Sequence, residues 1–92
     1  MPGKQLYVRC KVSSGLFETE YYVSVHRSSL YVDRAQVKVD RSPNPGDEVD
    51  GMVLAYVIHH DERIGEALVE FPGQPVVGGL RSWVPTGQLA FA

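Results

Sequence analysis

The chain has 92 residues, one cysteine and a formal net charge of −2, so we expect one domain, or two very small units that share a core. The single cysteine excludes an internal disulfide and fits a reducing compartment, and no apolar run is long enough to cross a bilayer or to act as a signal peptide. These features predict a soluble cytoplasmic protein without a membrane partner, and they exclude the disulfide-stabilised secreted scaffolds.

Alternating apolar residues predict four strands in the first half, because a strand with one buried face repeats every second residue. The expected strands span residues 6–12, 20–26, 29–32 and 37–39. Cys10 falls in phase with the apolar residues of the first strand, which predicts an inert buried thiol. The second and third strands are expected to pair around a turn at Arg27 and Ser28, with Val25 opposite Leu30. A tight turn then leads into the fourth strand.

A segment rich in proline and glycine at 41–46 divides the chain, since these residues disfavour regular structure. After this linker the expected strands span residues 49–58, 66–71, 80–84 and 89–91. The part from Met52 to Ile58 is apolar on both faces, which predicts a strand that is buried on both sides or lies between two packed units. Residues 59–65 are expected as a polar turn and 72–79 as a long loop. Because no segment shows the apolar spacing of a helix, the sequence predicts an all-β fold of about eight strands.

The two halves of the chain resemble each other in the order of their segments. Pro2-Gly3 is matched by Pro45-Gly46, Glu20–Val25 by Glu66–Phe71, and Tyr31–Val39 by Trp83–Phe91. A repeat of this length is typical of supersecondary units that bury their faces on a neighbour. One interpretation is an internal repeat, 2–40 and 45–91, in which two pseudo-symmetric half units pack together within a single domain of residues 1–92. The other is that unrelated antiparallel strands share the same alternating pattern.

The end of the second half resembles the close of Src-homology-3-like barrels. In Ser82–Phe91 a strand reaches Val84-Pro85, makes one tight turn and enters a short last strand, and Pro45–Val49 is similar to the opening of that group. The resemblance covers residues 45–92 and implies a small antiparallel barrel or sandwich. Many functions share this fold, so no single activity is implied. The chain lacks the Ala-Leu-Tyr-Asp-Tyr start and the paired tryptophans of proline-peptide binders, and polyproline recognition is therefore not implied.

Charge is divided unevenly between the two halves. Residues 1–42 carry seven Lys and Arg against four Asp and Glu, whereas residues 43–92 carry two against seven. An acidic half attracts a basic partner, so we expect a small non-catalytic module that binds another protein. The candidate contacts on the second half are Glu48, Asp50, Asp61, Glu62 and Trp83. Solvated charge without a partner is the alternative interpretation.

Nucleic-acid binding by the first half is the alternative function. Tyr21 shares the core phase of Val23 and Val25. The other tyrosines of this half, Tyr7, Tyr22 and Tyr31, fall out of phase with the core valines and are expected on the outer face, where aromatic rings stack on bases beside cations that neutralise phosphates. The candidate residues are Arg9, Lys11, Tyr22, Arg27 and Tyr31. The same rings could instead pack between the two halves, or form the interface of a homo-oligomer.

The sequence contains no pattern that indicates catalysis or a cofactor. His59-His60-Asp61-Glu62 is the stretch richest in metal ligands, but adjacent residues seldom chelate one ion and no distant Cys/His pair completes a set. No Gly-x-Ser-x-Gly elbow occurs, and no Lys-Ser/Thr follows Gly78-Gly79 as it would in a phosphate loop. We therefore expect no enzyme activity, no cofactor and no metal.

Overall fold

The structure is a computed structural model that describes residues 4–90, and strands make up 64% of it. The elements, in chain order, are β1 Lys4–Ser14, β2 Glu20–Val25, β3 Ser28–Asp33, the 3₁₀ helix η1 Arg34–Gln36, β4 Val37–Val39, β5 Glu48–Asp61, β6 Glu66–Glu70, β7 Gln74–Val77, β8 Arg81–Pro85, the 3₁₀ helix η2 Thr86–Gln88 and β9 Leu89–Ala90. The prediction of an all-β fold is confirmed. Within residues 4–90, no helix is long and apolar enough to cross a membrane.

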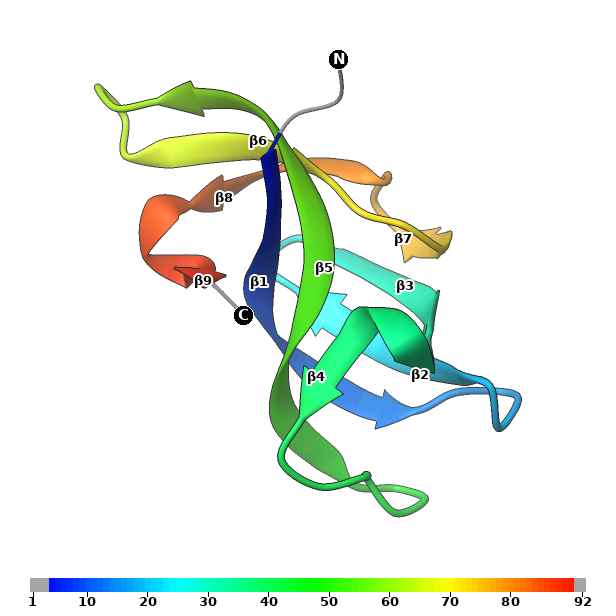
Figure 1. Cartoon of the computed structure of the whole chain (residues 1–92). Helices are drawn as coiled ribbons and strands as arrows, with labels where there is room; N and C mark the ends of the chain where they lie inside the picture. Colours follow the sequence, from blue (N-terminus) through cyan, green and yellow to red (C-terminus); the bar gives the residue numbers. More distant parts are fainter. Residues whose placement is uncertain (1–3, 91–92) are drawn as a thin grey trace.

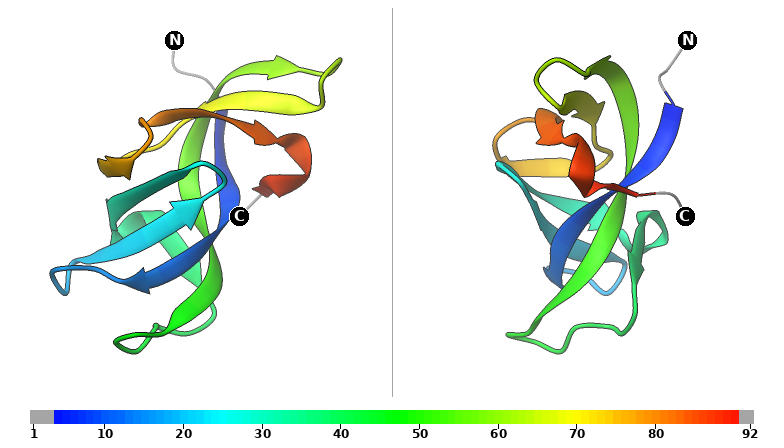
Figure 2. Two further views of the ribbon diagram at one scale, coloured as in Figure 1. Left: turned by 180° about the vertical axis from the view of Figure 1, so that it is seen from behind. Right: turned by 90° about the vertical axis from the view of Figure 1, so that its left-hand side faces the viewer.

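The nine strands form one antiparallel sheet that curls into a half-barrel (Figures 1 and 2). Its order is β7-β3-β2-β1-β5-β6-β8, while β4 pairs with β5 and β9 pairs with β1. The two longest strands, β1 and β5, lie side by side at the centre, from Lys4 opposite Val57 to Ser13 opposite Glu48. All other strands except β3, β7 and β8 pair directly with one of these two.

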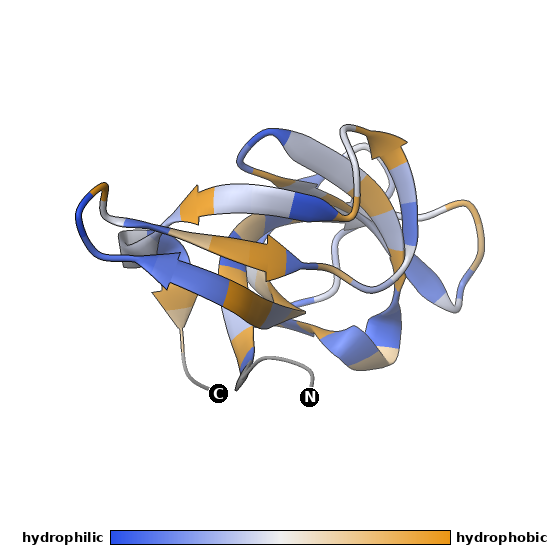
Figure 3. Cartoon of the chain, turned by 90° about the horizontal axis from the view of Figure 1, so that it is seen from above, coloured by the Kyte–Doolittle hydropathy of each residue, from blue (hydrophilic) through white to orange (hydrophobic). Residues whose placement is uncertain are grey.

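The inner face of the curled sheet carries the hydrophobic core. Buried residues alternate along the strands with more exposed ones. Hydrophobic and hydrophilic residues alternate along the same strands (Figure 3). The largest fully buried side chains are Phe71, Leu30, Val8, Val12, Val23, Val25, Val32, Val53, Val69 and Val84. Each such side chain stabilises the fold by about 1.5–3 kcal/mol relative to an exposed one. In the middle of β5, Val53, Leu54 and Ala55 are all buried, so the predicted two-sided burial is confirmed there.

The closing strand of each half pairs with the long strand of the other half. β4 places Val37 opposite Val53 of β5, and β9 places Leu89 opposite Val8 of β1. Val8 and Val53 also lie opposite each other. The two halves therefore interlock around the middle of the β1–β5 pair, and each half depends on the other for one strand of its sheet.

The hairpin segments that match in the sequence occupy equivalent positions in the pairing. Tyr22 lies opposite Tyr31 in the first half, and Leu68 lies opposite Trp83 in the second. From there each half continues through a 3₁₀ helix into a short strand. The Pro2-Gly3 part of the repeat lies outside the described residues. β7 interrupts the correspondence, because it is inserted between β6 and β8 whereas β2 and β3 are joined by a tight turn.

The β2–β3 turn differs by one residue from the expected one. It consists of His26 and Arg27, and Val25 lies opposite Ser28. His26 has a φ of 49°, in the left-handed region that tight two-residue hairpin turns require at their first position. The expected partner, Leu30, lies opposite Val23 instead, and because this shift is two residues the apolar faces still agree.

Two further segments are strands where the sequence predicted loops. β5 continues through His59–Asp61, expected as part of a turn, because these residues pair with β6. Gln74–Val77, expected within a loop, form β7 and pair with β3. Pro75 is compatible with this strand because β7 lies at the edge of the sheet, where one side of the backbone needs no partner. The sheet therefore has nine strands rather than about eight.

Candidate functional site

A row of aromatic and apolar side chains crosses the outer face of β5, β6 and β8. His59, Leu68 and Trp83 lie opposite one another on these three strands. The rings of His59 and Trp83 meet edge to face, with their centroids 6.0 Å apart, and Trp83 is 37% exposed. The row faces away from the core because Leu68 and Trp83 alternate along their strands with the buried residues Ala67 and Val84.

Carboxylates lie beside this row at the tip of the β5–β6 hairpin. Asp61 lies opposite Glu66, and Glu62 is exposed in the turn that follows β5. Asp61 accepts a hydrogen bond from the backbone amide of Arg63, whose guanidinium lies 3.4 Å away on a side chain that is 91% exposed. Three carboxylates against one exposed cation leave this tip negative. We call the following residues the tryptophan face: His59, Asp61, Glu62, Glu66, Leu68 and Trp83.

The other two acidic candidates lie at the opposite end of β5. Glu48 and Asp50 are opposite Ser13 and Lys11 of β1, and Lys11 donates a hydrogen bond to Asp50 that raises the pKa of the lysine. β5 is 14 residues long and a strand rises about 3.3 Å per residue, so Glu48 and Asp61 lie at its opposite ends. They are too far apart to contact the same residue of a partner. The structure therefore divides the five predicted protein contacts and keeps three of them together in the tryptophan face.

The candidates for nucleic-acid binding gather on the first half. Arg9 and Lys11 on β1, Tyr22 on β2 and Tyr31 on β3 lie on the outer face, and Arg27 lies in the β2–β3 turn. The rings of Tyr22 and Tyr31 pack against each other with centroids 5.3 Å apart and planes tilted by 59°. These two rings therefore pack within the first half rather than between the halves. Their neighbour Lys11 is already engaged by a carboxylate of β5.

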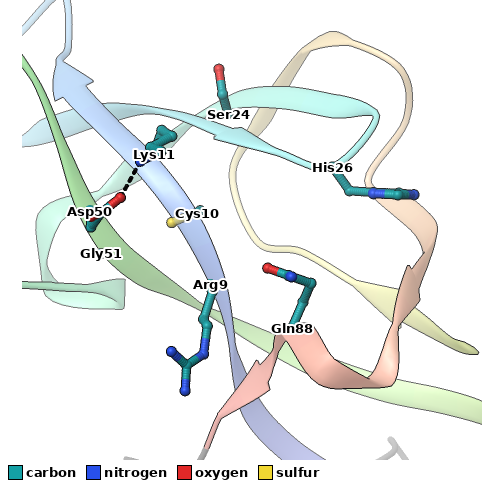
Figure 4. A pocket seen from close by; sticks show the side chains of 8 residues that line it. All are labelled: Arg9, Cys10, Lys11, Ser24, His26, Asp50, Gly51 and Gln88. Carbon is teal, nitrogen blue, oxygen red and sulfur yellow. Dashed lines mark hydrogen bonds and ion pairs between the residues drawn. The ribbon is translucent and has the colours of Figure 1, made fainter.

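A shallow pocket of about 470 Å³ opens where β1 leaves β9 and joins β2 (Figure 4). Its lining residues are Arg9, Cys10, Lys11, Ser24, His26, Asp50, Gly51 and Gln88. Cys10 is the sulfur in this pocket and is only 9% exposed. Burial, with a smaller contribution from the charge of Asp50, raises the pKa of the Cys10 thiol to about 12. The thiol stays protonated at neutral pH, which makes it a poor nucleophile.

The stretch richest in metal ligands is split by the pleat of β5. His59 reaches Trp83 on the outer face, whereas its neighbour His60 lies opposite Ala67, whose side chain is in the core. Two adjacent imidazoles that point to opposite faces cannot hold the same ion. In the part of the chain that the structure describes, no group of three or more His, Cys, Asp or Glu side chains is placed to bind a metal.

Three residues of the tryptophan face were missed among the predicted contacts: His59, Glu66 and Leu68. Glu66 and Leu68 alternate with the buried residues Ala67 and Val69, so the period of a strand alone indicates that they lie on the outer face. Their position next to Trp83 depends on the pairing of β6 with β8, which the long insertion between these strands conceals. Comparison with known proteins does not supply a relative, because neither a protein family, nor a curated protein, nor a solved structure matches the chain.

Proposed function

We propose that this protein is a small non-catalytic module that binds a basic segment of another protein through the tryptophan face. The observation that carries the proposal is the exposed ring of Trp83, held against His59 beside the carboxylates of the β5–β6 tip. The face of a tryptophan ring attracts lysine and arginine, and carboxylates attract the same side chains. Both features of the surface therefore select one kind of partner.

The architecture supports a scaffold of this kind. The curled antiparallel sheet, with a one-turn 3₁₀ helix before its last strand, is compatible with a small β-barrel, the broad class to which the resemblance of residues 45–92 points. Small barrels of this type present binding residues on a rigid sheet surface, and the function depends on the site rather than on the fold. The free cysteine Cys10 fits a reducing compartment, so a cytoplasmic location is part of the same proposal.

The proposal is tested by measuring the binding of a lysine- and arginine-rich peptide to the full chain at low salt. Trp83→Ala is expected to weaken binding about tenfold or more, since buried or stacked tryptophans are frequent centres of binding energy. Tyr31→Ala is the matched control, because Tyr31 occupies the equivalent position in the first half. Glu66→Gln and Glu62→Gln should each weaken binding and reduce its dependence on salt. Equal losses in the two aromatic variants would contradict the proposal.

Nucleic-acid binding by the first half is a second candidate, supported by one observation. Arg9, Lys11, Tyr22 and Tyr31 share one outer face, which is the arrangement that single strands require for stacking and charge neutralisation. It takes second place because Asp50 already pairs with Lys11. The test is retention of a single-stranded oligonucleotide, with a steep salt dependence and loss in Tyr22→Ala. Failure to retain any oligonucleotide at low salt removes this candidate.

A further inference from the structure

The hydrogen bonds at the two ends of the β6–β8 pair fix the direction of the backbone groups between them. At one end the amide of Phe71 donates to the carbonyl of Leu80 at 2.7 Å, and at the other the amide of Thr86 donates to the carbonyl of Gly65 at 3.0 Å. In an antiparallel pair, residues that bond across the ladder alternate with residues that do not. Both end hydrogen bonds predict the same alternation. Each residue of β8 can therefore be assigned either to the side that bonds to β6 or to the opposite side.

This alternation leaves one side of β8 without a partner strand, and the carbonyl of Trp83 on that side accepts only a long hydrogen bond, 3.5 Å, from the hydroxyl of Ser82. Ser82 and Val84 bond to β6, whereas Arg81 and Trp83 direct their amide and carbonyl groups to the opposite side. Pro85 adds a carbonyl on that side but has no amide. Among the strands of residues 4–90, β8 pairs with β6 alone. The strand that carries the tryptophan ring is thus also an open edge of the sheet.

The equivalent edge of the first half is covered by the protein itself. Ser29 and Tyr31 of β3 correspond to Arg81 and Trp83 of β8, and β7 pairs with them antiparallel. β7 is the inserted strand that breaks the correspondence between the halves. One of two equivalent edges is therefore occupied by an added strand, and the other is open beside the tryptophan face.

We propose that the open edge of β8 takes up an extended segment of a basic partner as an additional antiparallel strand, in the way that β7 adds to β3. This inference rests on the proposed function and specifies how the partner binds. The backbone groups of Arg81 and Trp83 that no strand pairs with hold the segment, and the charge of the neighbouring side chains decides which segment binds. Glu62 and Glu66 on the adjoining strand and turn favour a positively charged one.

The pleat of the sheet defines the pattern of the bound segment. A residue that lies opposite Trp83 has its side chain on the outer face, where a lysine or arginine can stack on the ring. The residues on either side of it point to the inner face, next to the buried Val84, and there small apolar side chains fit. The segment recognised is therefore one in which basic and small apolar residues alternate.

A capped nine-residue peptide of alternating lysine and valine is the probe, titrated into the full chain and followed by amide hydrogen exchange. In the free protein the amides of Arg81 and Trp83 should exchange much faster than those of Ser82, Val84 and Tyr31, which have partners. Binding of the probe should slow hydrogen exchange at Arg81 and Trp83 by about tenfold or more, because the amides must then break new hydrogen bonds before they exchange. Unchanged exchange at Arg81 and Trp83 in the bound state would overturn strand addition.

Two methylated peptides test the backbone contacts directly. In an antiparallel pair the residue opposite Trp83 directs its own amide toward β8, so N-methylation of the lysine amides should abolish binding. N-methylation of the valine amides, which point away, should leave binding within about twofold. Equal affinity of both methylated peptides would overturn the proposal.

A matched pair of protein variants tests the same contacts from the other side. Arg81→Pro removes an outward amide and retains the bonds to β6, and we expect about tenfold weaker binding, the equivalent of one hydrogen bond. Arg81→Ala also removes the ion pair with Glu70, at 2.9 Å, but it keeps the amide and should bind almost normally. Equal binding by these two variants, with unfolding curves showing both folded, would contradict the proposal.

The possible failures can be told apart. If the probe does not bind, or binds equally well to Trp83→Ala, the proposed function itself fails. If the probe binds through Trp83 but both methylated peptides bind equally, strand addition alone fails. A chain that sediments at twice its mass without peptide, with the amides of Arg81 and Trp83 protected, would show that a second copy occupies the edge, and the proposal of a basic partner would be wrong.

Discussion

At the scale of single residues, Cys10 links the stability of the fold to alkaline pH. Burial raises the pKa of its thiol from 9.0 to about 12, so the folded state holds the proton more tightly than the unfolded chain does. This contribution to stability is fully present below pH 9 and is lost as the pH rises toward 12, by roughly 1.4 kcal/mol for each pH unit. Chemical denaturation at several pH values should show this loss in the native sequence. In Cys10→Ala the slope should be smaller, and equal slopes would contradict the assignment.

An added methyl group at Gly51 should destabilise the fold. A Cβ there would lie 2.7 Å from the carbonyl oxygen of Lys38 and 2.9 Å from a methyl group of Val12, because β4 approaches β5 closely. Gly51→Ala should lower the free energy of unfolding by about 1–3 kcal/mol, measured by urea denaturation. Gly87→Ala is the control, since nothing lies within 4 Å of a Cβ at that position and Ala35 occupies the equivalent place in η1. Similar losses in both variants would refute this explanation.

At the scale of elements, β7 is expected to cover an edge rather than to build the core. All four of its residues, Gln74–Val77, are exposed, so their removal loses little apolar burial. Phe71 and Leu80 are a hydrogen-bonded pair, and a two-residue Asn-Gly turn fits between such residues. Replacing residues 72–79 by Asn-Gly should give a folded chain in which the amide of Tyr31 exchanges as fast as that of Trp83. Continued protection of Tyr31 would show that β7 is not its partner.

The same elements explain which parts of the fold could be predicted from the sequence. β1, β2 and β6 follow from local alternation, and Tyr21, Val23 and Val25 are buried as expected, because the period of a strand acts over neighbouring residues. β7 could not be predicted, since Pro75 disfavours strands except at edges, and edge position is a property of the assembled sheet. The division of the acidic candidates could not be foreseen either, because it depends on β5 remaining one continuous strand from Glu48 to Asp61.

At the scale of the whole molecule, the two halves are alike in the order of their elements and in how these elements pair. Each half forms a long strand, a hairpin, a one-turn helix and a closing strand, and each closing strand crosses to the other half. A duplication is one interpretation of this likeness, and a shared alternating pattern of unrelated strands is the other. If the halves share an origin, separate functions are expected where the halves differ. They differ in charge and in whether the outer strand of the hairpin has a partner, because β7 covers β3 whereas the edge of β8 is open.

The interlocked closing strands lead to a prediction about the halves as fragments. A fragment of residues 1–44 has β4 but lacks its partner β5, and a fragment of residues 45–92 has β9 but lacks its partner β1. Each is also below the size that usually folds without disulfides or metal. Circular dichroism should show little sheet and no cooperative unfolding for either fragment alone, whereas an equimolar mixture should recover the signal and the unfolding transition of the intact chain. If either fragment unfolded cooperatively as a monomer, a half would fold without the pairing of β1 with β5, and the prediction would be wrong.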